Sequence, residues 1–141
     1  MLRLSKKVEY AILALQYMGA RKGELVSAKE MSEFLNISFE FLSKTLQALM
    51  KGGLVKSQQG IKGGYQMTRD PSEISIADVI RSVDGKTGLV ECISKDKEGC
   101  DRVEDCTIRT PILKMHKRVS QIFAKTTIAD LLVEEEFEIN K

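Results

Sequence analysis

The first 70 residues contain two short helical segments joined by a tight turn, and this pattern limits the fold more than any other feature of the chain. Ser27 and Ser38 each stand where a helix N-cap is expected, and Glu30 is placed to complete a capping box with Ser27. The turn begins at Asn36, and the second segment continues to about Lys51, where two glycines end it. Its expected buried stripe is Phe39, Leu42, Leu46 and Leu49. This order predicts a helix-turn-helix.

A helix precedes this unit and a hairpin follows it. Apolar residues at helical spacing predict a first helix from Ser5 to about Ala20. Residues 54–58 and 65–68 have the composition of two short strands around a glycine-rich tip at 60–64, which is typical of a wing. Ser75 then starts a helix that runs to about Val83. We therefore expect residues 1–84 to form a mainly α winged helix-turn-helix with a small β-hairpin wing.

The second half of the chain divides into a loop, a long helix and a tail. Residues 85–106 follow neither helical nor strand periodicity, so we expect a loop. Within 107–133, a stripe spaced by four and three residues predicts a long helix, followed by a short helix from Ile128 to Val133; the stripe is Ile108, Ile112, Met115, Val119 and Ile122. Such a helix on a small head needs a partner surface, which suggests a dimerisation helix and a homodimer. The acidic residues 134–141 are expected to fray.

Charge is distributed unevenly along the chain. Residues 1–70 hold 11 Lys and Arg against 6 Asp and Glu, whereas residues 71–141 hold 11 against 14. A basic first half favours a polyanionic partner such as DNA. The sequence contains neither the roughly 18 consecutive apolar residues of a membrane span nor the apolar core of a signal peptide, so we expect a cytoplasmic protein. It also has no phosphate-binding loop or recognisable nucleophile arrangement, so an enzyme is not expected.

The polar side chains expected to contact DNA come from three places in the first domain. They are Ser5, Lys6 and Lys7 at the start of the first helix, Ser38, Glu40, Ser43, Lys44, Gln47 and Lys51 on the second helix of the helix-turn-helix, and Lys62 at the hairpin tip. A helix N-terminus and lysines suit phosphates. Glu40 can accept a hydrogen bond from cytosine, Gln47 can pair with adenine, and Lys44 suits guanine or phosphate. Winged helices also serve as protein–protein modules, and this alternative stays open.

All three cysteines of the chain, Cys92, Cys100 and Cys106, fall within 15 residues of each other. An odd number argues against a disulfide framework. The spacings are wider than the close pairs that zinc sites prefer, and thiolates also suit an iron–sulfur cluster or copper(I). Three free thiols or a redox disulfide remain alternatives. The single histidine, His116, offers one possible nitrogen ligand, although a surface or interface role is the simpler interpretation.

Several short motifs spread over nearly the whole chain occur together in one known family. They are Arg3-Leu4-Ser5-Lys6, Tyr10-Ala11, Ile37-Ser38, Gly53-Leu54-Val55, Gly63-Gly64-Tyr65, Ile76-Ala77-Asp78-Val79-Ile80 and Thr127-Ile128-Ala129-Asp130-Leu131-Leu132. With the spaced cysteines, they resemble the Rrf2 family of bacterial winged-helix regulators. The resemblance implies homodimers that bind a pseudo-palindromic operator, and an iron–sulfur cluster held by Cys92, Cys100 and Cys106 against the partner's first helix.

The sequence departs from this family pattern at two places. IscR-like members have a histidine three residues after the third cysteine, where this chain has Arg109; NsrR-like members use a carboxylate on the first helix, where this chain has Glu9. The resemblance therefore favours Glu9 of the partner copy as the fourth ligand. In the wing, Gln59 stands where the family often has arginine, and Lys62 is a candidate replacement.

The function expected from these features is a transcriptional regulator that senses iron–sulfur status, redox state or nitric oxide. The state of the cluster would shift the dimer between conformations of different operator affinity. The alternatives are a cluster-free thiol-redox repressor and a winged-helix protein–protein regulatory module.

Overall fold

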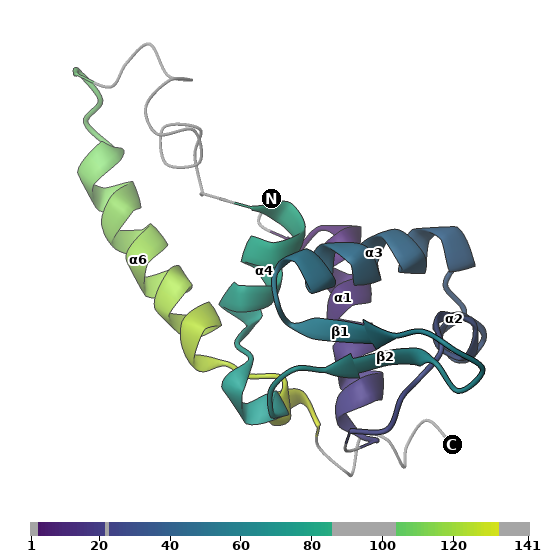
Figure 1. Cartoon of the computed structure of the whole chain (residues 1–141). Coiled ribbons are helices and arrows are strands. Elements are labelled where there is room, and N and C mark those ends of the chain that lie inside the picture. The colour runs from purple at the N-terminus through teal and green to yellow at the C-terminus, as the bar shows by residue number, and fades with distance from the viewer. Residues whose placement is uncertain (1–2, 22, 86–103, 133–141) are drawn as a thin grey trace.

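The computed structural model describes residues 3–21, 23–85 and 104–132, which form a small helical head, a two-stranded hairpin and one helix packed along the side of the head (Figure 1). The elements in chain order are α1 (Lys6–Gly19), α2 (Ala28–Leu35), α3 (Phe39–Lys51), β1 (Val55–Gln58), β2 (Gly64–Met67), the 3₁₀ helix η1 (Pro71–Glu73), α4 (Ile76–Asp84), α6 (Arg109–Lys125) and the 3₁₀ helix η2 (Ala129–Leu131). This order confirms the mainly α winged helix-turn-helix expected from the sequence. Cys92, Cys100 and the tail at 134–141 lie outside the described residues.

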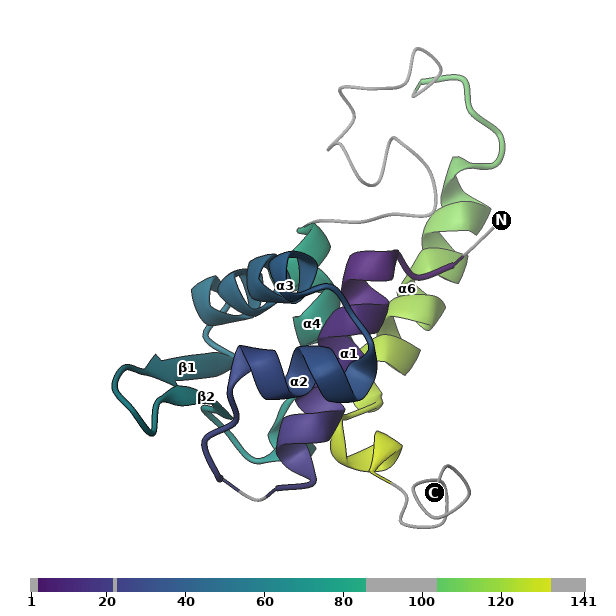
Figure 2. The ribbon, with the colours of Figure 1, turned by 90° about the vertical axis from the view of Figure 1, so that its right-hand side faces the viewer.

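The core of the head forms around α1, which lies between α2, α3 and α4 (Figure 2). Its members are apolar side chains from every helix of the head and from the start of β1: Val8, Ala11, Ala14, Leu15, Tyr17, Met18, Val26, Met31, Ile37, Leu42, Leu46, Leu49, Leu54, Val55, Ile74, Ile76, Val79 and Ile128. Burial of such side chains is the main favourable contribution to folding. Ile128 comes from the chain beyond α6, so the end of the described chain returns to the same core.

Two sequence expectations about the helix-turn-helix are wrong in detail. Phe39 does not belong to the buried stripe of α3, since 56% of its surface is exposed, whereas Leu42 and Leu46 are fully buried. Phe39 is the first residue of its helix, and its side chain is not among those packed in or against the core. At α2 the N–H of Glu30 donates to Ser27 Oγ (3.0 Å), but the reciprocal bond from Glu30 is absent among the described residues.

The short helix expected from Ile128 to Val133 is a 3₁₀ turn over Ala129–Leu131 within the described chain. Asp130 closes this turn, since its carboxylate accepts a hydrogen bond from the N–H of Thr127 (2.9 Å). A single turn is too short for the regular i to i−4 bonding of an α-helix.

The wing is anchored to the head by a backbone contact at its base. β1 and β2 pair antiparallel, with Val55 opposite Met67 and Gln58 opposite Gly64. Val26, on the connection between α1 and α2, exchanges hydrogen bonds with Tyr65 of β2, at 2.9 Å from its N–H and 2.7 Å to its carbonyl oxygen. Gly64 permits this approach, because a Cβ there would lie 2.7 Å from the carbonyl oxygen of Val26. The hairpin therefore depends on a glycine at position 64.

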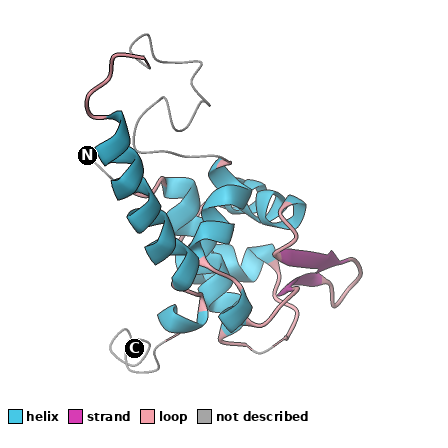
Figure 3. Cartoon of the chain, turned by 90° about the vertical axis from the view of Figure 1, so that its left-hand side faces the viewer, coloured by secondary structure: helices cyan, strands magenta, loops and turns pink. Residues whose placement is uncertain are grey.

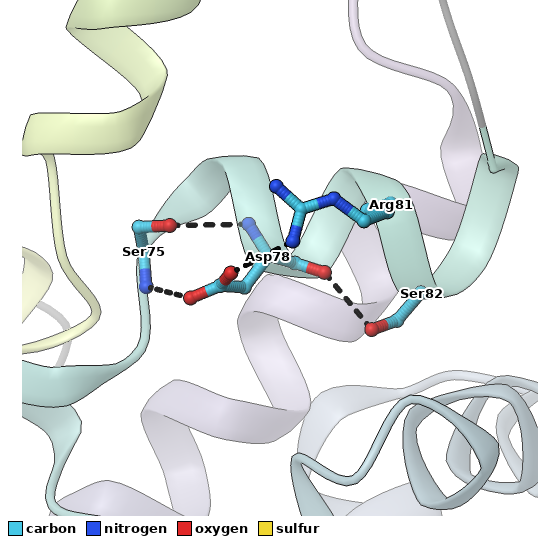
Figure 4. A network of polar contacts seen from close by, with 4 residues as sticks. All are labelled: Ser75, Asp78, Arg81 and Ser82. Carbon is cyan, nitrogen blue, oxygen red and sulfur yellow. Dashed lines mark hydrogen bonds and ion pairs between the residues drawn. The ribbon is translucent and has the colours of Figure 1, made fainter.

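A complete capping box starts α4, the helix that leads into the cysteine segment (Figure 4). The Asp78 N–H donates to Ser75 Oγ (3.1 Å), and the Asp78 carboxylate accepts from the Ser75 N–H (3.0 Å) and from Arg81 (3.3 Å). Burial acts to raise the pKa of Asp78, but the hydrogen bonds from Ser75 and the charges of Arg81 and Arg69 outweigh it and lower that pKa below its ordinary value. The charged form of Asp78 is thus the one that the fold stabilises.

Replacing Asp78 with asparagine should lower the free energy of unfolding at neutral pH by about 1 kcal/mol, because the charged cap is lost. A carboxyl whose pKa is lower in the folded state stabilises the fold above its unfolded pKa of about 3.9, and this contribution disappears as the pH falls through the folded value. Urea unfolding from pH 7 down to pH 3 should therefore show the two proteins converging at the acidic end. Asp105→Asn, at an exposed position, is the control. A constant difference across this range would contradict the assignment.

The same helix packs very closely on the end of α3. Gly52 is the C-cap of α3, and a Cβ on it would meet Ser82 Oγ and lie 2.6 Å from Ser82 Cβ. The Ser82 hydroxyl itself donates to the carbonyl of Asp78 (2.9 Å). The absence of a side chain at residue 52 lets the end of α3 lie directly against the Ser82 side chain of α4.

α6 lies along the outside of the head, on the side away from the hairpin (Figures 1 and 3). It packs beside α4, and Phe123 is its contribution to the core. No residue of α6 is fully buried, and three members of its apolar stripe are largely in solvent: Ile108 (59%), Met115 (48%) and Ile122 (63%). In the described parts of the chain, no helix has the length and apolarity needed to cross a membrane.

Candidate nucleic-acid interface and cysteine segment

The geometry of the helix-turn-helix depends on three local features of the turn between α2 and α3. Asn36 ends α2 in the left-handed conformation (φ 54°), which an asparagine tolerates better than most residues. Ser32 Oγ then donates to the carbonyl of Ile37 (2.6 Å), and Ser38 Oγ accepts from the N–H of Phe41 (3.2 Å). The Ser38 cap expected from the sequence is confirmed. These bonds hold the start of α3 in one position relative to α2.

One face of α3 is largely exposed to solvent and carries most of the expected DNA-binding side chains. Glu40, Lys44, Gln47 and Lys51 are exposed, and Ser43 is half-buried beside them. The ammonium group of Lys44 lies 3.6 Å from the Glu40 carboxylate, and both side chains are in solvent, at 74% and 84% exposure. An exposed pair of this kind is weak, so each member is available to another partner.

The N-terminus of α1 places the next candidates at a junction with α4. Ser5 Oγ accepts from the Val8 N–H (3.2 Å) and donates to the Asp84 carboxylate (2.7 Å), at the end of α4. Lys7 is exposed. Lys6 pairs with Glu9 at 2.9 Å, and the hydrogen bond to Glu9, together with its charge, raises the pKa of Lys6. Sequence reasoning missed the Ser5–Asp84 bond, because its partners are 79 residues apart.

The hairpin tip extends away from the head. Gly60 has a φ of 125°, and the Gly63 N–H donates to the Gly60 carbonyl (2.9 Å), which closes the turn. Gln59, Ile61 and Lys62 are all exposed on this tip. The candidates of α3, the α1 N-terminus and the tip therefore come from three separate elements of one head.

Only two of the expected metal ligands lie in the described chain. The Cys106 thiol is free and half-buried, three residues before α6 begins, and the Glu9 side chain is 45% exposed on α1. Within one copy, no three His, Cys, Asp or Glu residues of the described segments gather as a metal site. His116 lies on α6, and its Nε2 is 3.4 Å from Ser120 Oγ. His116 and Glu9, the two candidates for the fourth ligand, therefore lie on different helices, α6 and α1.

The helix-turn-helix followed by a hairpin defines the chain as a winged helix-turn-helix, a class that places its second helix in the major groove of DNA. The chain belongs to the Rrf2 family: the family model described as "Iron-dependent Transcriptional regulator" matches residues 4–134. Rrf2 transcriptional regulators bind DNA, and this chain is a transcriptional regulator of that family rather than an enzyme.

The relatives include regulators of more than one kind. The chain is 33% identical over 132 residues to the transcriptional regulator IscR of Serratia proteamaculans, covering 93% of this chain and 79% of the relative. It is 32% identical over 136 residues to the regulator NsrR of Oceanobacillus iheyensis, covering 96% and 92%. The solved structure of CymR, the global cysteine regulator of B. subtilis, matches with a TM-score of 0.77 at 27% identity, covering 94% of this chain and 97% of that one.

Proposed function

We propose that this protein is a homodimeric regulator whose operator affinity depends on an iron–sulfur cluster held by Cys92, Cys100 and Cys106. Residues 1–84 would be the DNA-binding head, 85–106 the sensory segment and 107–133 the dimerisation region. The observation that carries the proposal is the grouping of the only three cysteines immediately before α6, in a chain whose relatives include IscR and NsrR. Thiolates are the usual ligands of such clusters.

The described donors are compatible with this role. Among the described residues, the Cys106 thiol is free and the Glu9 carboxylate pairs with one exposed lysine, Lys6. Because the solvent screens the Lys6–Glu9 pair, opening it costs little. We propose Glu9 of the second copy as the fourth ligand, with His116 as the alternative. When bound, the cluster would supply a centre sensitive to oxidation and to small reactive gases.

The proposed route to the DNA starts from the ends of two helices. Asp84 ends α4 where the sensory segment begins, and its carboxylate accepts a hydrogen bond from Ser5 at the start of α1. A change in residues 85–106 would therefore act on the end of α1 that carries Ser5, Lys6 and Lys7. On the head, α3 would lie in the major groove of DNA, and Lys62 of the wing tip would approach the minor groove. Gln59 would stand where the family often has an arginine.

The test is the composition and visible absorption of protein prepared without oxygen. Wild-type protein should contain iron and sulfide and absorb broadly in the visible range, and Cys106→Ser should lose most of both while its helical circular dichroism and melting temperature stay unchanged. Glu9→Gln should keep the cysteine-bound iron but shift the spectrum or shorten its lifetime in air. Glu24→Gln, an exposed carboxylate elsewhere on the head, is the matched control.

Two other outcomes would replace this proposal. A colourless protein that forms a disulfide after mild oxidation, and loses DNA binding with it, would be a cluster-free thiol-redox repressor. The likeness to CymR, a cysteine regulator, makes this the second candidate. Phosphate contacts make DNA binding steeply dependent on salt, so a DNA-binding protein should bind at low salt. A protein that binds no duplex DNA at any salt concentration would instead be a protein–protein module.

A further inference from the structure

The helix expected to read DNA begins with a large apolar side chain in solvent. Phe39 is 56% exposed, although it is the first residue of α3 and stands directly after the Ser38 cap. The other aromatic residue of that turn, Phe41, packs against Tyr10: the two rings meet edge-on, with centroids 5.1 Å apart. Phe39 is absent both from the core and from the residues packed against it.

The position of Phe39 determines where its ring can reach. In an α-helix each Cα–Cβ bond tilts toward the N-terminus, so a side chain in the first turn extends toward and beyond the helix start. In a helix-turn-helix, that end of the second helix contacts the base edges. Glu40 is its exposed neighbour in sequence, and Ser43 lies one turn further on. Phe39 and Ser43 are four residues apart on α3, so the ring lies next to Ser43 at the N-terminal edge of the face that carries the polar candidates.

We propose that Phe39 contacts the C5-methyl group of a thymine in the major groove and thereby contributes to operator specificity. The inference rests on the placement of α3 in the groove proposed above. Thymine is the one base that presents an apolar group there, and a phenyl ring is suited to covering it. The contact removes apolar surface of both partners from water. Phe39 is then a specificity residue that uses shape and apolar contact beside the hydrogen bonds of Glu40 and its neighbours.

The experiment removes single methyl groups from the DNA. A duplex is first selected from a random pool by the wild-type protein prepared without oxygen. Each thymine of that duplex is then replaced by deoxyuridine, which differs only in lacking the methyl group, and the dissociation constants of wild type and Phe39→Ala are measured on every substituted duplex. Losing contact with one methyl group should weaken wild-type binding about fourfold per half-site. The same substitution should leave Phe39→Ala unaffected.

The controls separate this inference from the rest of the account. Phe34→Ala removes another exposed aromatic ring, which packs on Tyr17 of α1 instead (centroids 4.8 Å), and it should keep the wild-type response to deoxyuridine. Phe39→Leu should retain part of the methyl effect. Circular dichroism and molecular mass must match wild type for every variant.

Three results would overturn the inference. Equal responses of wild type and Phe39→Ala at every thymine would show that the ring touches no methyl group. A selected site in which no thymine is required would show the same. A change of molecular mass in Phe39→Ala would show that the ring serves an interface between protein copies. Failure to select any duplex would instead refute the placement of α3 in the groove, and with it the proposed function.

Discussion

Introducing two carboxylates on the exposed apolar face of α6 should convert the proposed dimer into a monomer and weaken operator binding by about 100-fold or more. The variant is Met115→Glu combined with Ile122→Glu, at positions 48% and 63% exposed in the single chain. Two linked heads bind paired half-sites with an advantage that arises from effective concentration, and a separated head loses it. Sedimentation equilibrium and titration of the selected duplex measure the two effects.

The design of this test depends on which side of α6 is changed. Thr110→Glu combined with Gln121→Glu adds the same two charges to exposed positions on the other side of the helix, and this control should remain dimeric. Neither pair includes Phe123, which packs against the core of the head, so both variants should keep the fold. A Met115/Ile122 variant that sediments as a dimer would refute the assignment of α6 as the dimerisation helix.

Replacing Gly64 with alanine should lower the free energy of unfolding by about 3 kcal/mol. The new Cβ would lie 2.7 Å from the carbonyl oxygen and 2.8 Å from the carbonyl carbon of Val26, and neither backbone atom can move like the end of a side chain. Relief requires opening the two hydrogen bonds between Val26 and Tyr65 that hold the base of the wing. Urea unfolding measures the loss.

The matched control for Gly64 is Gln58→Ala, because Gln58 is its partner across the hairpin and its side chain is exposed. This change should cost much less, since it leaves the Val26–Tyr65 bonds intact. The Gly64→Ala variant should also lose affinity for the selected duplex, because the base of the wing would no longer be anchored to the head. If Gly64→Ala were as stable as wild type, the close approach seen in the structure would be wrong.

The sequence predicted the helices of the head well because their signals are local. Ser5, Ser27, Ser38 and Ser75 are all caps in the structure, as their positions before apolar stripes indicated. The hairpin was equally predictable from its glycine-rich tip and from the composition of the two short strands around it. Phe39 was misassigned because periodicity gives the direction of a side chain around the helix axis, but not whether a neighbouring element extends far enough to cover the helix end.

The candidate site was predictable only in its composition. The polar face of α3 follows from helical spacing, and the structure leaves that face in solvent. The Ser5–Asp84 bond and the contact of Gly52 with Ser82 join parts of the chain that are distant in sequence, so no local pattern reports them. The roles of the cysteines rest on family resemblance, since Cys92 and Cys100 lie outside the described residues and the proposed fourth ligand, Glu9, would belong to a second copy.

The close contact between Gly52 and Ser82 limits the ways in which α3 and α4 can move relative to each other. The backbone of Gly52 lies directly against the Ser82 side chain, so sliding α4 along α3 would cause a collision, and we expect the two helices to move together as one rigid unit. A signal arriving at the far end of α4 would then tilt the whole head rather than reshape its reading surface. The signal would then change the distance and angle between the two rigid heads of the dimer. The base preference of each head would stay the same.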